Sequence, residues 1–216
     1  MDALEAMRTV GSTRYFRAED VPDEVVYRAA EAARFAPQGG NRQPVRLVVV
    51  RDRTKKERLR DLYLPWWRAY FEGAEAGTRE LGEYASARRA LLDANHFAEH
   101  LAEHPLIIVV CARIDALHVT DLELDRPSVV GGASIYPYVQ NLCLALRVEG
   151  VATTITSLLV GSEPRVKELL AIPAGYLTAA HVVAGYPANG FPTRLSRRPV
   201  EETVFVDTWD NPIPPP

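Results

Sequence analysis

The sequence has few cysteines, no long apolar run and almost no excess charge of either sign, and each of these absences excludes a class of protein. Its 216 residues include 25 Lys and Arg against 28 Asp and Glu, for a formal net charge of −3. Because the two charges are nearly balanced, the chain is not expected to have the basic surface that nucleic-acid binding requires. No apolar stretch reaches the length of a membrane span, and the first residues lack the pattern of a signal peptide. We therefore expect a cytoplasmic protein that binds neither a membrane nor nucleic acid.

The motifs of several catalytic classes are also missing. The two cysteines, Cys111 and Cys143, lie in apolar stretches, where a buried, reduced thiol is the ordinary role. There is no G-x-S-x-G and no cysteine with an evident histidine partner. No G-x-G-x-x-G follows a strand, so a nicotinamide held permanently on a Rossmann unit is not expected.

Three histidines recur at a spacing that metal ligands on a helix can show. His96, His100 and His104 are four residues apart, on one helical face. Acidic residues stand beside them and a proline follows at once, which is typical of a solvated helix face. We expect no metal site there.

Apolar periodicity predicts a single domain in which strands are separated by helical stretches. Buried strands are predicted over residues 45–50, 105–112, 151–160 and 177–187, where apolar and β-branched residues concentrate. Helices are predicted over residues 2–9, 22–35, 54–103 and 162–171, and a further long one ends near Gly150. The region 54–103 is expected to break near Pro65 and between Gly73 and Gly82. This order is typical of an α/β or α+β chain, and the proline-rich tail after Phe191 is expected to run extended along a surface.

The stretch VGSTRYF, residues 10–16, offers groups that a phosphate monoester binds. Ser12 and Thr13 supply hydroxyls, Arg14 supplies a guanidinium, and a short loop presents main-chain N–H groups; this combination suits a phosphate. A surface loop with one solvated arginine has the same pattern, so the stretch alone leaves both interpretations open.

The stretch ARFAPQGGNRQPVRLVVV places a dense group of amides between a helix and a strand. Pro37 ends the helix, and Gly39 with the glycine after it lets the main chain approach a flat ligand closely. The side chains of Gln38, Asn41 and Gln43 both donate and accept hydrogen bonds, as the recognition of a heteroaromatic ring requires. Alternatively, these amides satisfy the backbone of their own loop.

Three further stretches are candidates for contact with a ligand. The segment Thr153–Ser157 follows a helix end and could present main-chain N–H groups to a ligand edge, although a plain core strand has the same pattern. The stretch LYLPWWRAYF carries aromatic residues that form either a helix core or a lid over aromatic acceptors, with Trp66, Trp67, Arg68 and Tyr70 as the acceptor contacts. Three arginines come just before the tail: Arg194, Arg197 and Arg198. They are either solvated or reach back toward the phosphate.

In order and spacing these stretches resemble the FMN-dependent nitroreductase family over about residues 4–206. VGSTRYF resembles its phosphate loop, and APQGGNRQPVRLVVV its APSSxNxQPWxFxVV signature. GASIYPYVQNLCLALRVEGVATTIT resembles its central helix and flavin-edge segment. LLAIPAGYLTAAHVVAGYP resembles its LLxIPxxxxxxxxxxxGYP block, and SRRPVEETV its terminal phosphate-contacting stretch. The resemblance implies an α+β, three-layer nitroreductase-like fold with a central, mostly antiparallel sheet flanked by helices and an extended C-terminal tail.

The resemblance also implies one domain over residues 1–216, in which residues 199–216 form the tail and pack on a partner subunit. It implies an intertwined homodimer with FMN at the interface, where the loop at Pro37 lies over the flavin of the other copy. Val10 and Gly11 stand where the family more often has basic residues, so either phosphate binding is weaker or the positive charge comes from elsewhere, such as Arg8, Arg197 or Arg198. The FMN-binding residues implied are Arg8, Ser12, Thr13, Arg14, Pro37, Gln38, Gly39, Asn41, Gln43, Thr154, Ile155, Thr156, Arg197 and Arg198.

The activity implied is that of an FMN-dependent NAD(P)H oxidoreductase. In a ping-pong cycle, NAD(P)H reduces the flavin at N5 and leaves, and a small aromatic, nitro or quinone-type acceptor then takes the hydride. A main-chain N–H from Thr154–Thr156 would meet N5. Two alternatives remain open: another FMN reaction on the same fold, such as dehalogenation, dehydrogenation or flavin breakdown, and a flavin-binding or sequestering protein with little turnover.

Overall fold

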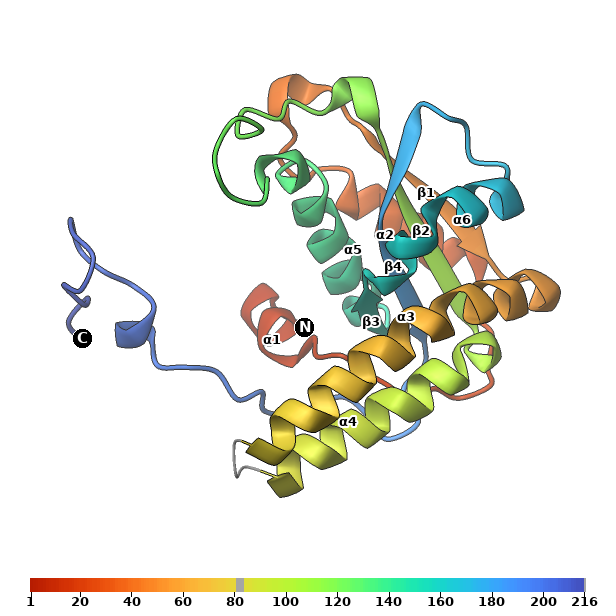
Figure 1. The fold of residues 1–216 in the computed structure, drawn as a ribbon, viewed down its shortest axis with the longest axis horizontal. Coiled ribbons are helices and arrows are strands. Elements are labelled where there is room, and N and C mark those ends of the chain that lie inside the picture. The colour runs from red at the N-terminus through yellow and green to blue at the C-terminus, as the bar shows by residue number, and fades with distance from the viewer. Residues whose placement is uncertain (81–83, 216) are drawn as a thin grey trace.

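The computed structural model of the chain describes residues 1–80 and 84–215, with the side chains of residues 74–87 left out of the description. The helices are α1 (Ala3–Thr9), α2 (Asp23–Ala33), α3 (Arg53–Glu80), α4 (Tyr84–Glu99), α5 (Tyr136–Val148) and α6 (Glu163–Leu170). The strands are β1 (Val45–Val50), β2 (Leu106–Arg113), β3 (Ala152–Thr156) and β4 (Tyr176–Gly185). Figure 1 shows this arrangement.

The four strands form one sheet in the order β1-β2-β4-β3, and every neighbouring pair is antiparallel. The inner strand β2 is buried from Leu106 to Ala112, which explains its continuous apolar sequence, because helices cover both of its faces. A register shift between Val110 and Cys111 interrupts the pairing of β2 with β4. The expected α+β fold with an antiparallel sheet is confirmed.

Two hydrophobic clusters show that the sheet is the middle of three layers. One cluster joins the sheet to α2 and α5, and the other joins its opposite face to α3, α4 and α6 (Figure 1). Cys143 belongs to the first cluster and Cys111 to the second, and both are buried free thiols. Burial raises the pKa of each thiol to about 11, so neither is a nucleophile at neutral pH. The expectation of buried, reduced cysteines is confirmed.

The long helical region differs from its prediction. Helix α3 continues through Pro65 and past Gly73 to Glu80, where breaks were expected; residues 81–83 of the second expected break lie outside the described residues. A proline inside a helix removes one main-chain hydrogen bond. Here the helix continues because Leu62, Tyr63 and Trp67 bury apolar side chains on both sides of that position, and tertiary packing outweighs local propensity.

Strand β3 is shorter than predicted. It ends at Thr156, and residues Leu158–Ser162 form a 3-10 turn instead of extending the strand. Ser162 stands at the N-cap position of α6 but makes no capping bond. Its hydroxyl donates to the Leu62 carbonyl (3.1 Å) and accepts from the Trp66 indole N–H (2.9 Å). A serine at this position usually caps the helix that follows. Here its hydroxyl bonds Leu62 and Trp66 of α3 instead.

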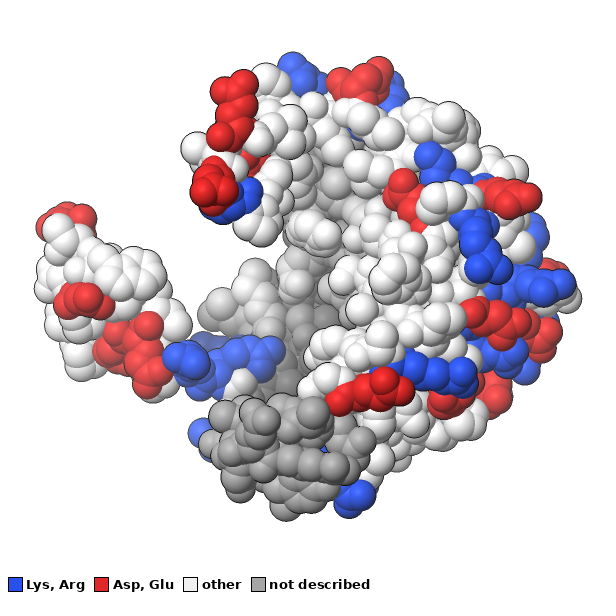
Figure 2. All heavy atoms as spheres, in the orientation of Figure 1, with Lys and Arg blue, Asp and Glu red and all other residues white. Residues whose placement is uncertain are grey.

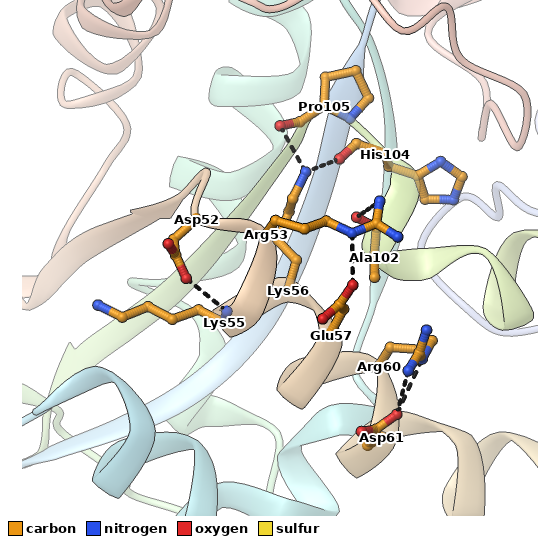
Figure 3. A network of polar contacts seen from close by, with 10 residues as sticks. All are labelled: Asp52, Arg53, Lys55, Lys56, Glu57, Arg60, Asp61, Ala102, His104 and Pro105. Atoms are coloured by element: carbon orange, nitrogen blue, oxygen red, sulfur yellow. Dashed lines mark hydrogen bonds and ion pairs between the residues drawn. The ribbon is translucent and has the colours of Figure 1, made fainter.

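A buried lysine ties the start of α3 to the start of β2. The Lys56 ammonium donates to the carbonyl oxygens of His104 (2.6 Å) and Pro105 (3.4 Å), as Figure 3 shows. Arg53, one turn earlier, donates to the Ala102 carbonyl (3.2 Å). Burial, reinforced by the charge of Arg53, lowers the pKa of Lys56. These bonds stabilise the junction because a buried carbonyl without a partner is costly.

The three histidines do not share one helix face. Helix α4 ends at Glu99, and His104 follows a separate 3-10 turn and is buried against Phe97 and Phe16, whereas His96 is exposed. The prediction of one solvated face is wrong for His104, because the chain turns into β2 there. Among the residues whose placement is described, no group of three His, Cys, Asp or Glu side chains could hold a metal ion. Within the same residues no helix is both long and apolar enough to cross a bilayer.

The C-terminal residues leave the body of the molecule as an arm (Figure 1). A 3-10 turn forms at Val200–Glu202, and the end of the arm folds back so that the Ile213 N–H donates to the Val204 carbonyl (3.0 Å). Trp209 is 81% exposed. Figure 2 shows this arm across an open gap from the rest of the chain, with basic side chains where it departs.

Candidate functional site

The loop expected to bind phosphate is attached to the start of strand β3. Ser12 forms a parallel bridge with Thr153, and the Thr13 N–H donates to the Thr153 carbonyl (3.0 Å). The Thr154 hydroxyl donates back to the Thr13 carbonyl. Two stretches that are about 140 residues apart in sequence are therefore adjacent, as a shared binding site requires.

The C-terminal segment covers the same loop. A Cβ atom added to Gly11 would lie 2.9 Å from Leu195 Cδ2, closer than real Cβ atoms approach other atoms, and 3.1 Å from Pro192 Cγ, which is tighter than most real contacts. Gly11 thus permits the chain near Leu195 to pack directly on the loop. This contact brings the arginine-containing segment close to Ser12.

Arg14 and Tyr63 connect the loop to helix α3. The Tyr63 hydroxyl lies 3.3 Å from the Thr156 hydroxyl, which donates to it. Burial raises the pKa of Tyr63, while the Thr156 bond and the positive charge of Arg14 oppose the rise. Tyr63 therefore lies at the junction of the phosphate loop and the flavin-edge segment, a place that the sequence, which indicated a helix core or a lid over acceptors, did not predict for it.

The flavin-edge segment is the end of β3. Thr153 and Thr154 are buried, and Ile155 is 44% exposed. In the described sheet β3 has β4 on one side, and on its other side the bridge from Ser12 reaches only Thr153, so the edge beyond Thr153 can present main-chain N–H groups.

The second loop, from Pro37 to Gln43, adopts a tight and unusual backbone. Residues Gly39–Asn41 form a 3-10 turn, and positive φ values occur at Gly40 (58°), Asn41 (51°) and Gln43 (50°). Non-glycine residues in this region are uncommon and concentrate at functional sites. The Gln38 amide donates to the Arg34 carbonyl and the Gln43 amide to the Asn41 side chain, both at 3.3 Å. Part of the amide array thus satisfies its own loop.

A cavity of about 450 Å³ adjoins this loop. It is lined by residues 37–39, by 116–118 and Thr120, and by Val130, Gly131, Ala133 and Ser134. The Gly39 N–H donates to the Ser134 hydroxyl (3.0 Å), which fixes the loop against the residues that precede α5.

The structure separates the expected FMN contacts into two groups. The loop at Gly39 is bonded to Ser134, just before α5 begins, while Thr13 is bonded to Thr153, after α5 has ended. Helix α5 has 13 residues, which corresponds to a length of about 20 Å. Within one chain the two groups therefore lie at opposite ends of this helix and do not form one pocket.

The remaining cations predicted at the phosphate are exposed. Arg8 is in the last turn of α1. Arg197 donates to the neighbouring Ser196 carbonyl (2.6 Å), and Arg198 lies 3.8 Å from the Glu202 carboxylate. None of the three has a partner in the body of the described chain that would hold it away from the loop.

The aromatic residues expected to contact an acceptor occupy different environments. Trp67 is buried and its indole N–H donates to Asn95 (2.7 Å). Trp66 packs on Gly161, where an added Cβ would lie 2.4 Å from its ring, while its outer surface is half exposed. Tyr70 is exposed, and Arg68 lies 3.5 Å from the Glu99 carboxylate of α4.

Asp121 organises the loop that borders the cavity, and the sequence analysis missed it. Its carboxylate is buried and accepts from the side chains of Arg126 (2.8 Å) and Ser128 (2.7 Å) and from the N–H groups of Val129 (2.9 Å) and Val130 (3.3 Å). These bonds hold the pKa of Asp121 far below its usual range, and the bond from the Val129 N–H has the largest effect. A short acidic stretch without periodicity gave no sequence signal for this role.

We expect Asp121→Ala to lower the melting temperature by several degrees, because four donors lose their acceptor. A depressed carboxyl pKa stabilises the fold above the ordinary value of about 4, and this stabilisation is lost as the pH falls below it. Thermal unfolding measured between neutral pH and pH about 3 checks this. Asp115→Ala, which removes an exposed partner of Arg113, is the matched control; equal melting temperatures for the two variants would contradict the prediction.

Comparison with known proteins finds one family and several relatives that span most of the chain. A model described as "Nitroreductase family" matches residues 8–186. An NADH dehydrogenase of Thermus thermophilus is 30% identical over 210 residues, which cover 95% of this chain and 96% of the relative. Iodotyrosine deiodinase 1 of Rattus norvegicus is 25% identical over 196 residues, which cover 90% of this chain but only 65% of the rat protein.

Solved structures share the fold. A BluB-like flavoprotein from Clostridium difficile 630 aligns with a TM-score of 0.71 at 20% identity, over 96% of this chain and 100% of that one. The NADPH:FMN oxidoreductase from Vibrio harveyi complexed with NAD+ aligns with a TM-score of 0.68 at 20% identity, over 96% of this chain and 78% of that one. At these identities the likeness concerns the fold alone.

Proposed function

This chain belongs to the nitroreductase family, and on that premise we propose that it is an FMN-dependent oxidoreductase that takes a hydride from NAD(P)H and passes it to a small acceptor. Bound FMN would supply the hydride chemistry at N5, in a ping-pong cycle that both substrates enter in turn. The observation that carries the proposal is the attachment of the Ser12–Arg14 loop to the Thr153–Thr156 strand end, since a phosphate site and a ring-edge site must be neighbours.

The residues at β3 fit such a cofactor. The hydroxyls of Ser12 and Thr13 and the guanidinium of Arg14 are suited to a phosphate monoester. The free edge of β3 offers main-chain N–H groups at Thr154, Ile155 or Thr156 for a ring nitrogen. Arg8, Arg197 and Arg198 are proposed to add charge when the C-terminal segment closes on the loop.

The proposal requires two copies of the chain. The loop at Pro37, with Gln38, Gly39, Asn41 and Gln43, lies about one α5 length from the phosphate loop, so it would cover the flavin of the partner subunit. Exposed apolar side chains support association, since isolated chains rarely leave so many uncovered. They include Leu4 and Met7 on α1, Tyr27 on α2, Phe35, and Trp209 on the arm.

The arm is proposed to pack on the second copy. It carries exposed Val200, Val204, Val206 and Trp209, and within the described residues its main-chain hydrogen bonds from residue 199 onward join residues of the arm itself. A single domain over residues 1–216, in which residues 199–216 form this arm, remains our proposal for the domain organisation.

The acceptor is proposed to lie near the exposed faces of Trp66 and Tyr70. Both are on α3, the helix that carries Tyr63 to the end of β3, and aromatic faces stack on flat acceptors. Buried Trp67 and ion-paired Arg68 would act through the packing of α3 on α4.

Anaerobic reduction tests this function directly. Protein loaded with FMN is mixed with NADH or NADPH, and the loss of the oxidised flavin absorbance is followed; a nitroaromatic, a quinone and an iodotyrosine are then added. We expect bleaching by a nicotinamide and recovery with at least one acceptor. Protein that binds FMN but is bleached by neither nicotinamide would instead be a flavin-sequestering protein.

A second candidate reaction is reductive dehalogenation. It is favoured by the 25% identity to iodotyrosine deiodinase 1 over 90% of this chain. Recovery of the oxidised flavin by iodotyrosine, with release of iodide, would select this reaction over nitro or quinone reduction.

A further inference from the structure

Arg147 is a buried cation without a counter-charge. It lies in the last turn of α5 and is 8% exposed. Its Nε donates to the Thr9 hydroxyl (3.1 Å), and its guanidinium stacks on the Phe191 ring at 3.6 Å. Among the residues that the structure describes, no carboxylate lies within ion-pair distance of it, and Glu149, two residues further on, is paired with Arg28 (2.7 Å).

The structural roles of this side chain do not explain its burial. An arginine at a helix C-terminus gains a small stabilisation from the helix dipole, and stacking on an aromatic ring adds a modest attraction. Removing a guanidinium from water costs more than either when no carboxylate compensates it. Within the described part of the chain, no hydrogen bond is made by either Nη atom, and neither belongs to the buried side-chain atoms without a partner. These donors therefore remain open at the surface and are available to an anion from outside the chain.

The surroundings of Arg147 indicate which anion. Thr9 is three residues before Ser12, and the Gly11 N–H donates to the Thr9 carbonyl (3.0 Å). Phe191 precedes Pro192, which packs on Gly11. The guanidinium thus contacts the two segments that border the Ser12–Arg14 loop, through Thr9 and Phe191.

We propose that Arg147 is a binding residue for the phosphate monoester of the cofactor and supplies positive charge beside the loop at residues 9–14. This inference rests on the proposed function and extends its site to a residue of the central helix. It also predicts that the chain without ligand holds an uncompensated charge, which phosphate binding relieves.

The test compares FMN with riboflavin, which lacks the phosphate. In Arg147→Met, which keeps an unbranched apolar stem, we expect FMN affinity to fall about 10- to 100-fold while riboflavin affinity stays the same. We expect the melting temperature of the ligand-free variant to equal or exceed that of the wild type. Inorganic phosphate should raise the melting temperature of the wild type more than that of the variant. Arg113→Met, which removes an exposed arginine of β2, is the control and should match the wild type.

Two results would overturn the inference. One is an unchanged ratio of FMN to riboflavin affinity in the folded variant; the other is a lower melting temperature with unchanged FMN affinity, which would identify a purely structural arginine. Arg147→Gln, which can still donate to Thr9, replaces the first variant if that one does not fold. A wild-type chain that binds neither flavin would remove the proposed function instead, and the effect of inorganic phosphate would then decide the role of Arg147.

Discussion

Two inactive variants of this chain are expected to restore one working flavin site when they are combined in one dimer. Arg14→Glu places a negative charge at the phosphate and should weaken FMN binding more than about 100-fold. Gly39→Phe adds a ring where the loop at residues 37–43 is proposed to come closest to the flavin. A Cβ atom at this position would meet only the Ser134 hydroxyl, at 3.6 Å, so we expect the fold to tolerate the substitution. Each variant alone should bind almost no FMN.

The combination distinguishes a shared site from a site within one chain. If the loop at Gly39 acts on the other copy, both defects fall in the same site of the mixed dimer, and its second site is intact. The two variants are given different affinity tags, the mixed species is purified, and its FMN content is titrated. We expect half of the wild-type content at wild-type affinity. No FMN in a folded mixed dimer would show that both loops serve the same chain.

Acid is expected to unfold the protein between pH about 6.5 and pH about 4, because two buried histidines resist protonation. Burial lowers the pKa of His104 and of His181 to about 4. His104 retains one hydrogen bond, from its Nε2–H to the Phe97 carbonyl (3.2 Å). Within the described residues neither ring nitrogen of His181 has a partner at hydrogen-bonding geometry, and the nearby Thr156 backbone offsets only part of the lowering of its pKa by burial. Below its ordinary pKa the unfolded chain binds a proton that the folded chain does not, so stability falls with falling pH. Each of the two histidines lowers the free energy of unfolding by up to about 3 kcal/mol once the pH is below its pKa in the folded state.

His181→Leu isolates this effect. The substitution removes a buried titrating group without leaving a hydrogen-bonding partner unsatisfied, so stability at pH about 8 should be equal or higher and its decline toward acid less steep. Denaturant unfolding at a series of pH values measures both. His96→Leu changes an exposed histidine and should give the same dependence of stability on pH as the wild type. If wild type and His181→Leu have identical profiles, His181 does not cause the loss of stability in acid.

The features that the sequence predicts well are those with a local physical cause. The strand at residues 45–50 and the helix ending before Gly150 (φ 80°) form as expected, because apolar periodicity and the left-handed backbone after a helix are properties of short segments. The order of the polar loops likewise identified the family.

The features that the sequence does not predict depend on contacts between distant segments. The passage of α3 through Pro65 depends on packing against α4, and the loss of the Ser162 cap depends on Trp66 and Leu62 of α3. Arg147 and Asp121 have no motif of their own; what singles them out is burial with or without a partner, which only the fold reveals.

Sedimentation of the purified chain with FMN, followed at the visible absorbance of the flavin, tests the shared site most directly. We predict that the flavin moves with a particle of two chains and saturates at one FMN for each chain. Flavin that moves with a single chain, or that does not move with the protein at all, would contradict it.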